Sequence, residues 1–269
     1  MEVIRLGVIH IPGSAGSSLG TALGQALGCR YLPVHRARPF DNNNGEDIFT
    51  IEIPNGTNSL SRELLLSYPL ISGHLSIGQL QATFRTHIIL VVAEPRLRLI
   101  KLFAHHAAPG INFEQWLTQR ISYSSEIIDQ LMRGIAIPEN AHWSQLHAMG
   151  NRAPLGINWE YQEKHVAQLI SPINQIFLTN NPQFVIDRLY SENLLMQHVN
   201  CERINLRSEK RAVNWGNLTS SLSALKNLTK NDYKFIAQVS PKSAIDPNFK
   251  VSSDEEVEQF FTQMIALTS

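Results

Sequence analysis

Near its N-terminus the chain reads Val8-Ile9-His10-Ile11-Pro12-Gly13-Ser14-Ala15-Gly16-Ser17-Ser18-Leu19. Residues 3–11 form an apolar, β-branched run that is typical of a buried strand, whereas apolar residues recur at helical spacing from Leu19 to Leu27, just before Gly28. Between the two patterns lie six residues without a bulky side chain. The segment therefore predicts a buried strand, a tight loop and the start of a helix.

The predicted loop has the properties of an anion-binding site. Small side chains let backbone N–H groups approach an anion closely, and the following helix contributes roughly half a positive charge at its N-terminus. The candidate ligands are therefore Gly13, Ser14, Ala15, Gly16, Ser17 and Ser18. A tight turn that binds nothing is an equally compatible interpretation. The loop is not a Walker A motif, because Ile11 and Ser17 stand where that motif needs Gly and Lys.

The clearest strand pattern is at residues 86–93, a continuous apolar run that a helical pattern follows at 96–106. A strand that is apolar along its length is typical of the centre of a parallel sheet with helices on both faces. Because such strands alternate with helices, the sequence predicts a three-layer α/β sandwich with a central parallel sheet, in which strands 3–11 and 86–93 are adjacent. No linker or repeat divides the chain, so we expect a single domain over residues 1–269.

Weaker patterns predict the remaining elements. We expect strands at residues 29–33, 48–53, 70–71 and 175–180, and helices at 59–66, 113–133, 161–170, 182–196, 218–228, 231–237 and 254–267, the last on the outside of the sheet. Residues 135–157 mix loop-forming residues with His and Trp, which suits either a stabilising plug or a lid over a substrate.

Gly73 and His74 follow the short predicted strand at 70–71. They would therefore lie at the carboxyl end of a strand, where open α/β sheets place their ligand groups. An imidazole with a pKa near 6.5 is suited to take a proton from a hydroxyl group. His74 is thus a candidate general base, although the chain has ten histidines and a packed or surface histidine is the alternative.

Composition excludes several classes of function. Lys and Arg together number 23 and balance 23 Asp and Glu, so no excess charge favours a nucleic acid partner. Cys29 and Cys201 have no metal-binding or C-x-x-C spacing, so we expect no metal site and reduced thiols, with a disulfide between them left open. No apolar run approaches the roughly 18 to 20 residues of a membrane span, and no leader pattern is present, so we expect a cytoplasmic protein without a membrane partner.

Residues 10–19 resemble the H-I-P-K-T-A-G-T-S-L segment of the carbohydrate sulfotransferases of the Golgi and bacterial type. In that family the loop holds the 5′-phosphosulfate of the donor PAPS (3′-phosphoadenylyl sulfate), whose desulfated form is PAP. The catalytic lysine of the family falls on Gly13. The family also has a Gly-His pair at the point of its chain that corresponds to Gly73 and His74. The histidine of that pair, here His74, is a candidate general base toward the acceptor. Golgi members of the family carry a membrane anchor, whereas we expect this chain to be similar to the bacterial, cytoplasmic type.

A second family segment, L-R-D-P-x-x-R-x-x-S-x-Y, resembles residues 92–103. Its Arg and Ser bind the 3′-phosphate of PAPS, and here these positions are Ala93 and Lys101. Lys101 is a candidate replacement ligand for this phosphate, because lysine serves elsewhere as a point-charge partner of phosphate, and a solvated lysine on the helix is the alternative. A late basic loop often reaches the same phosphate in the family, which makes Lys210 and Arg211 further candidates, with a charged surface turn as the alternative.

The resemblance implies transfer of a sulfuryl group from PAPS to a hydroxyl of a small-molecule or carbohydrate acceptor. The alternative is a catalytically decayed binding or scaffold protein, because Gly13, Ala93 and Lys101 all depart from the family's pattern. A kinase or nucleotide hydrolase is the weakest hypothesis, since the chain has neither a Walker lysine nor an evident acidic metal motif.

Overall fold

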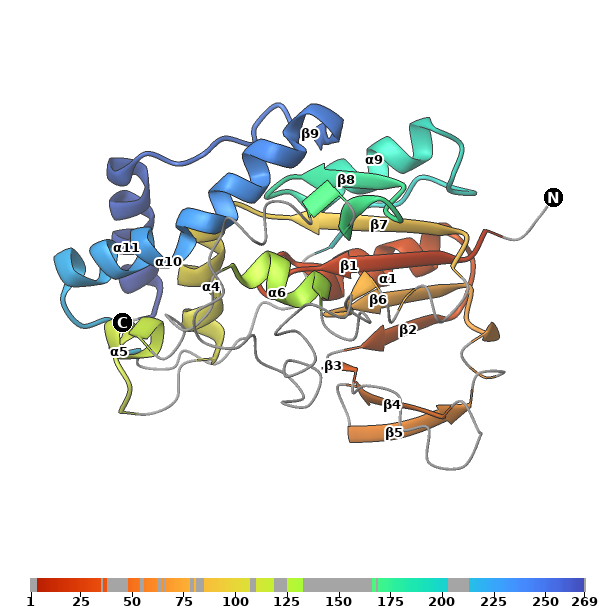
Figure 1. Ribbon diagram of the computed structural model, residues 1–269, viewed down its shortest axis with the longest axis horizontal. Coiled ribbons are helices and arrows are strands. Elements are labelled where there is room, and N and C mark those ends of the chain that lie inside the picture. The colour runs from red at the N-terminus through yellow and green to blue at the C-terminus, as the bar shows by residue number, and fades with distance from the viewer. Residues whose placement is uncertain are drawn as a thin grey trace, which may run out of the picture.

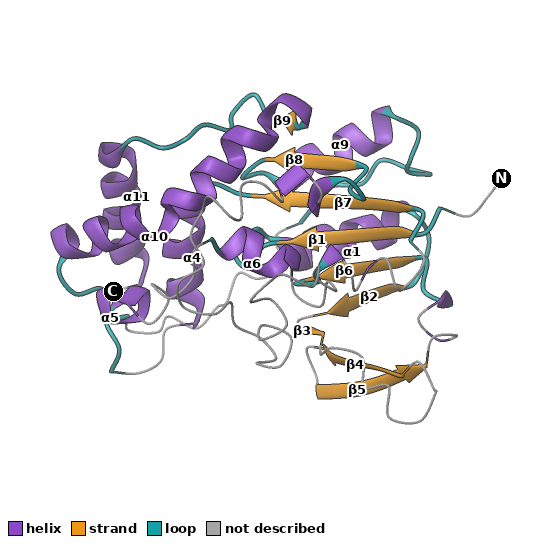
Figure 2. Ribbon diagram, viewed as in Figure 1, coloured by secondary structure: helices purple, strands orange, loops and turns teal. Residues whose placement is uncertain are grey.

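The computed structural model describes residues 4–34, 36–37, 48–53, 56–61, 64, 66–77, 80, 85–106, 110–118, 125–132, 166–167, 169–202 and 213–268. Within them the protein has a central sheet of six strands, all parallel, in the order β2-β6-β1-β7-β8-β9 (Figures 1 and 2). These strands are β1 (Leu6–His10), β2 (Tyr31–Val34), β6 (Leu70–Gly73), β7 (His87–Val92), β8 (Gln175–Leu178) and β9 (Ala244–Ile245).

The first strand lies at the centre of this sheet. β1 pairs with β7 in parallel, from Leu6 opposite His87 to His10 opposite Val91, and pairs with β6 on its other side. The predicted adjacency of the two long apolar strands is therefore confirmed. Side chains alternate along β1, so that Val8 belongs to one apolar cluster and Ile9 to the other.

Helices cover both faces of the sheet, which confirms the predicted α/β class. α1 (Gly16–Ala26) and α9 (Pro182–Ser191) pack on the face to which Val8 points. α6 (Glu126–Met132) and the second half of α10 (Leu218–Val239) pack on the opposite face. In Figure 1 the first pair lies behind the sheet and α6 lies in front of it.

A further group of helices lies beyond the carboxyl ends of the strands, at the left of Figure 1. We call it the helical cluster: α4 (Pro95–His106), α5 (Phe113–Thr118), α11 (Asp254–Thr268), the first half of α10 and Trp215. Aromatic rings fill its core, with Phe113 in contact with Phe103, Trp116, Trp215 and Phe261. α11 packs here against α4 and α10, and not on the outside of the sheet as predicted.

Two other element predictions were wrong. The expected helix at 59–66 is replaced over its first residues by β5 (Gly56–Ser61), which pairs with β4 (Ile48–Ile53) in a small antiparallel sheet whose third strand is β3 (Arg36–Ala37). Pairing along the whole of β4 outweighs the weak helical pattern. The two expected helices at 218–228 and 231–237 are one helix, α10, because no Gly or Pro interrupts them and the buried face continues through Leu228 and Asp232.

Smaller differences concern helix ends. α9 ends at Ser191 instead of residue 196, because Asn193 takes a left-handed backbone conformation at φ 60°. After α10, a short 3-10 helix, Ser240–Lys242, leads into β9, an edge strand that the sequence did not predict.

Among the residues that the structure describes, none of the helices combines the length and the apolar character that a membrane span requires. The predictions for residues 135–157 lie outside the described residues.

Candidate functional site

The loop after β1 lies where the connections of the sheet diverge. From β1 the chain leads through α1 to β2, on one side, whereas from β7 it leads to β8, on the other side. In open parallel sheets such a divergence between neighbouring strands marks the usual place of a ligand, at the carboxyl edge. The candidate anion loop and the segment that begins α4 therefore meet at this edge.

Residues 13–18 form a loop and an uncapped helix start. Gly13 (φ 86°) and Ala15 (φ 57°) have left-handed backbones, and Ala15 is the N-cap of α1. No side chain caps this helix and no acidic residue occupies its first turn. The first backbone N–H groups of a helix have no partner within it, so those of Gly16, Ser17 and Ser18 form a positive end suited to an anion.

His10 lies against this helix start, and His74 lies against His10. Their ring centroids are 4.7 Å apart and the rings meet edge to face, at 74°. His10 is buried and His74, which follows the last residue of β6, is half-buried. A Cβ on Gly16 would lie 2.1 Å from Nδ1 of His10, so only glycine allows the imidazole to approach the first turn this closely. The structure thus links the predicted histidine, His74, to the predicted loop through His10.

Arg98 supports the loop from α4. Its side chain is fully buried, and Nη1 donates to the carbonyl oxygen of Pro12 at 3.1 Å and to Oε2 of Glu126 at 2.9 Å. Nη2 lies 3.5 Å from Oδ2 of Asp232 on α10. Burial raises the pKa of Asp232 to about 6, while Arg98 and a hydrogen bond from Ser125 act in the opposite direction. The loop therefore rests on a buried cation with two carboxylate partners.

Gly13, where the similar sulfotransferase segment has lysine, lies beside this arginine. A Cβ there would lie 3.0 Å from Cγ and 3.1 Å from the carbonyl oxygen of Arg98. Beside it, two buried polar atoms, Oγ of Ser14 and Nε of Arg98, have no hydrogen-bond partner among the described residues. Since buried polar atoms are usually hydrogen-bonded, these two donors are available to oxygen atoms of a ligand.

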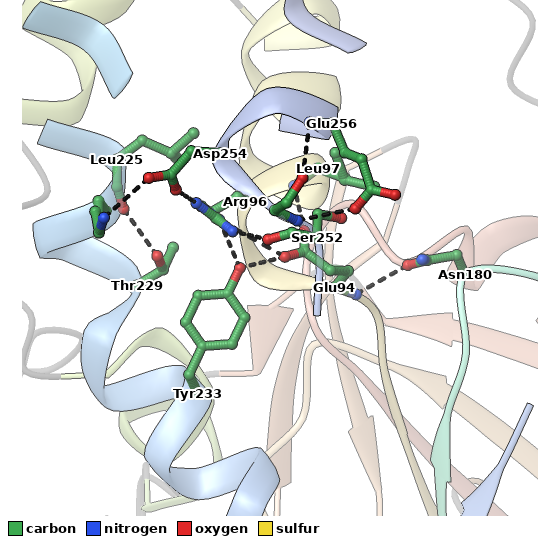
Figure 3. Close-up of polar contacts among 12 residues, drawn as sticks. Glu94, Arg96, Leu97, Asn180, Leu225, Thr229, Tyr233, Ser252, Asp254 and Glu256 are labelled. Carbon is green, nitrogen blue, oxygen red and sulfur yellow. Dashed lines mark hydrogen bonds and ion pairs between the residues drawn. The ribbon is translucent and has the colours of Figure 1, made fainter. Parts of the chain in front are cut away.

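The residues after β7 form a network within the protein (Figure 3). Glu94 is fully buried, and its Oε2 accepts from the backbone N–H of Leu97 at 2.7 Å, which caps α4. Its Oε1 accepts from the hydroxyl of Tyr233, which in turn accepts from Nε of Arg96 at 2.8 Å. Nη1 of Arg96 also donates to Asp254 at 2.5 Å. The charged groups of Glu94, Arg96 and Asp254 thus form contacts between α4, α10 and α11.

The other predicted cations lie elsewhere or outside the described residues. The ammonium group of Lys101 lies 5.5 Å from the ring centroid of Phe260, in the helical cluster. Lys210 and Arg211 are outside the described residues. In the described ranges no group of three or more His, Cys, Asp or Glu side chains could hold a metal ion.

Sequence reasoning did not find the roles of His10 and Arg98. Both stand inside quoted motifs, and the alternation of β1 places His10 on the face that α1 covers. That alternation is the signal that could have assigned His10 to the site. Comparison with known proteins gives no matching family, no similar curated protein and no similar solved structure. A functional assignment therefore rests on the residues and geometry of this edge of the sheet.

Proposed function

We propose that the protein is a sulfotransferase-like enzyme that binds PAPS at residues 13–18 and transfers its sulfuryl group to a hydroxyl of a sugar or small molecule. The observation that carries this proposal is the contact of His10 with an uncapped helix start, and of His74 with His10, at the carboxyl edge of the sheet. The order of the motifs along the chain, which resembles that of the carbohydrate sulfotransferases, supports it.

The donor supplies an activated sulfuryl group on a phosphate oxygen. The backbone N–H groups of residues 16–18 and the Ser14 hydroxyl stabilise negative charge on that phosphate as the bond from its oxygen to sulfur breaks. His74 accepts the proton of the acceptor hydroxyl while its oxygen forms the new bond to sulfur. Without a lysine at Gly13, the rate is expected to be lower by a factor of about 10² to 10³ than with one.

A second candidate is a protein that keeps the fold without catalysis. It is favoured by the contact of Gly13 with Arg98, which fills the place of a lysine side chain, and by the contact of Lys101 with Phe260. In this case Arg98 stabilises the loop and takes no part in catalysis.

Calorimetry with PAP tests the loop as a phosphate site. We expect binding that Ser14→Ala weakens about three- to tenfold, the loss of one hydrogen bond. Ser221→Ala is the matched control, because the hydroxyl of Ser221 is also buried and unpartnered among the described residues but belongs to α10. An affinity for PAP that is unchanged by Ser14→Ala would contradict this site.

Transfer of radiolabelled sulfate from PAPS to a panel of hydroxyl acceptors separates the two candidates. The enzyme is expected to label an acceptor, and His74→Asn should abolish labelling while PAP still binds. Binding of PAP without labelling of any acceptor would favour the binding protein. No binding at millimolar PAP would exclude the enzyme and favour a scaffold.

A further inference from the structure

Gln130 of α6 joins the two chain segments that carry the histidine pair. Its side chain is buried, with 1% of its surface exposed. Nε2 donates to the carbonyl oxygen of His10 at 3.0 Å and to that of Leu75, the residue after His74, at 3.3 Å. One amide group therefore uses both of its N–H bonds to link the end of β1 to the turn after β6.

The sheet itself does not make this link. Parallel pairing of β1 with β6 ends at Ile9 and Gly73, one residue before each histidine. Beyond that point, His10 continues to pair with β7, and the backbone N–H of His74 donates to the carbonyl oxygen of Val34 in β2 at 3.0 Å. The two histidines thus follow diverging strands, and Gln130 spans the divergence.

α6 holds the loop at a second point. Glu126 lies one helical turn before Gln130, so both side chains project from the same face of α6. Glu126 accepts from Nη1 of Arg98, the group that also donates to the carbonyl oxygen of Pro12. One face of a single helix therefore fixes the chain at His10 directly and at Pro12 through Arg98.

We infer that Gln130 is a positioning residue, which sets the edge-to-face contact of His10 with His74 and so the direction in which His74 meets an acceptor. The inference rests on the proposed function for the role of His74 as a base, but the contact of the rings can be measured without it. A displaced base lowers the rate of a transfer without lowering the affinity for the donor. For a displacement of about 1 Å the loss reaches about a hundredfold.

The test compares Gln130→Met, which keeps the length of the side chain and removes both donors, with Gln183→Met. Gln183 is a matched control on α9, where its Nε2 donates to Asp187 at 2.7 Å and to the carbonyl oxygen of Val199 at 3.1 Å. Magnetisation transfer between the His10 and His74 rings is measured by NMR in labelled protein. We expect it in the unaltered protein and in Gln183→Met, and its loss in Gln130→Met together with changed ring chemical shifts. Unchanged ring contact in Gln130→Met overturns the inference.

A measurement on the unaltered protein covers the case in which Gln130→Met does not fold. Both Nε2 protons of Gln130 should exchange slowly with water, and rapid exchange would overturn the inference. PAP affinity and sulfuryl transfer are measured on the same samples. Where transfer is detected, it should fall about ten- to hundredfold in Gln130→Met at unchanged PAP affinity. Where PAP does not bind at all, the proposed function fails while the ring contact still decides the role of Gln130.

Discussion

Gly13 is the residue at which the conformation of the loop can be tested most directly. Its φ of 86° is unfavourable for any other residue, and a Cβ would press on Arg98 at 3.0 Å. We expect Gly13→Ala to lower the free energy of unfolding by about 1 to 3 kcal/mol. Chemical denaturation followed by circular dichroism measures the loss.

Gly28 provides the control for that prediction. It also has a left-handed backbone, at φ 58°, but nothing lies within 4 Å of the position of its Cβ. Gly28→Ala therefore reports the backbone strain alone, and the additional loss in Gly13→Ala reports the contact with Arg98. Equal losses in the two variants would mean that Arg98 does not close off the space beside Gly13.

Asp232 makes stability depend on pH. Burial raises the pKa of its carboxyl group from 3.8 to about 6, so the folded protein binds a proton at Asp232 more tightly than the unfolded chain does. The stabilisation is complete below pH 3.8 and is lost as the pH rises through about 6, and a shift of about two units corresponds to about 3 kcal/mol. We expect the stability of the unaltered protein, relative to Asp232→Asn, to fall by about this amount from pH 4 to pH 7 in urea denaturation.

An exposed carboxylate separates this effect from the general titration of carboxylates. Glu255 lies on the exposed side of α11, and Glu255→Gln should keep the pH dependence of the unaltered protein. The assignment to Asp232 fails if Asp232→Asn keeps it as well.

The sequence indicated the residues of the loop and His74 because each follows a strand, and strand ends are visible in a linear pattern. It did not indicate the supports of the loop. The partners of Arg98, which are Glu126 and Asp232, lie 28 and 134 residues further along the chain. A buried arginine or glutamine on a helix has the same local pattern as an exposed one, so partners that tertiary packing brings together leave no signal of this kind.

At the scale of elements, α4 is held by a buried glutamate. Glu94 caps its first turn through Leu97 and accepts from Tyr233 of α10. Glu94→Ala should lower the free energy of unfolding by about 2 to 4 kcal/mol, through the lost cap and through a buried hydroxyl left without its acceptor. Thermal and urea denaturation measure the change.

A second glutamate cap distinguishes burial from capping alone. Glu256 accepts from the backbone N–H of Ser253 at 2.9 Å, and the Ser253 hydroxyl accepts from the backbone N–H of Glu256, at the exposed start of α11. Glu256→Ala should therefore destabilise much less than Glu94→Ala. Similar losses in both variants would show that the contacts of Glu94 with α10 contribute little.

The elements also show which predictions a linear pattern supports. Strands β1 and β7 were predicted as neighbours because a continuous apolar strand can be buried only at the centre of such a sheet. The segment 59–66 is half leucine and half polar, and its pattern does not reveal that β4 is available as a pairing partner. β9 is only two residues long and pairs with β8 at the edge, so its strand conformation comes from the sheet and not from its own residues.

For the molecule as a whole, α10 connects two hydrophobic cores. Leu225 and Leu228 in its first half belong to the helical cluster, whereas Phe235, Ile236 and Val239 in its second half pack on the sheet. A continuous helix transmits the loss of either core to the other, because unfolding one half removes the turns that the other half continues. The sheet and the helical cluster are therefore expected to unfold together, as one domain.

Tryptophan fluorescence from the helical cluster alone can test whether the two cores unfold together. Trp116 and Trp215 lie in the helical cluster, and replacing the other two tryptophans, Trp143 and Trp159, by Phe makes fluorescence specific for it. In that background Leu23→Ala, between α1 and the sheet, should lower the unfolding free energy by about 2 to 5 kcal/mol. The denaturation midpoint should fall equally by fluorescence and by far-ultraviolet circular dichroism. Val257→Ala, inside the helical cluster, is the control that must move both signals. If Leu23→Ala leaves the midpoint measured by fluorescence unchanged, the chain consists of two independently folding units, and α10 does not couple them.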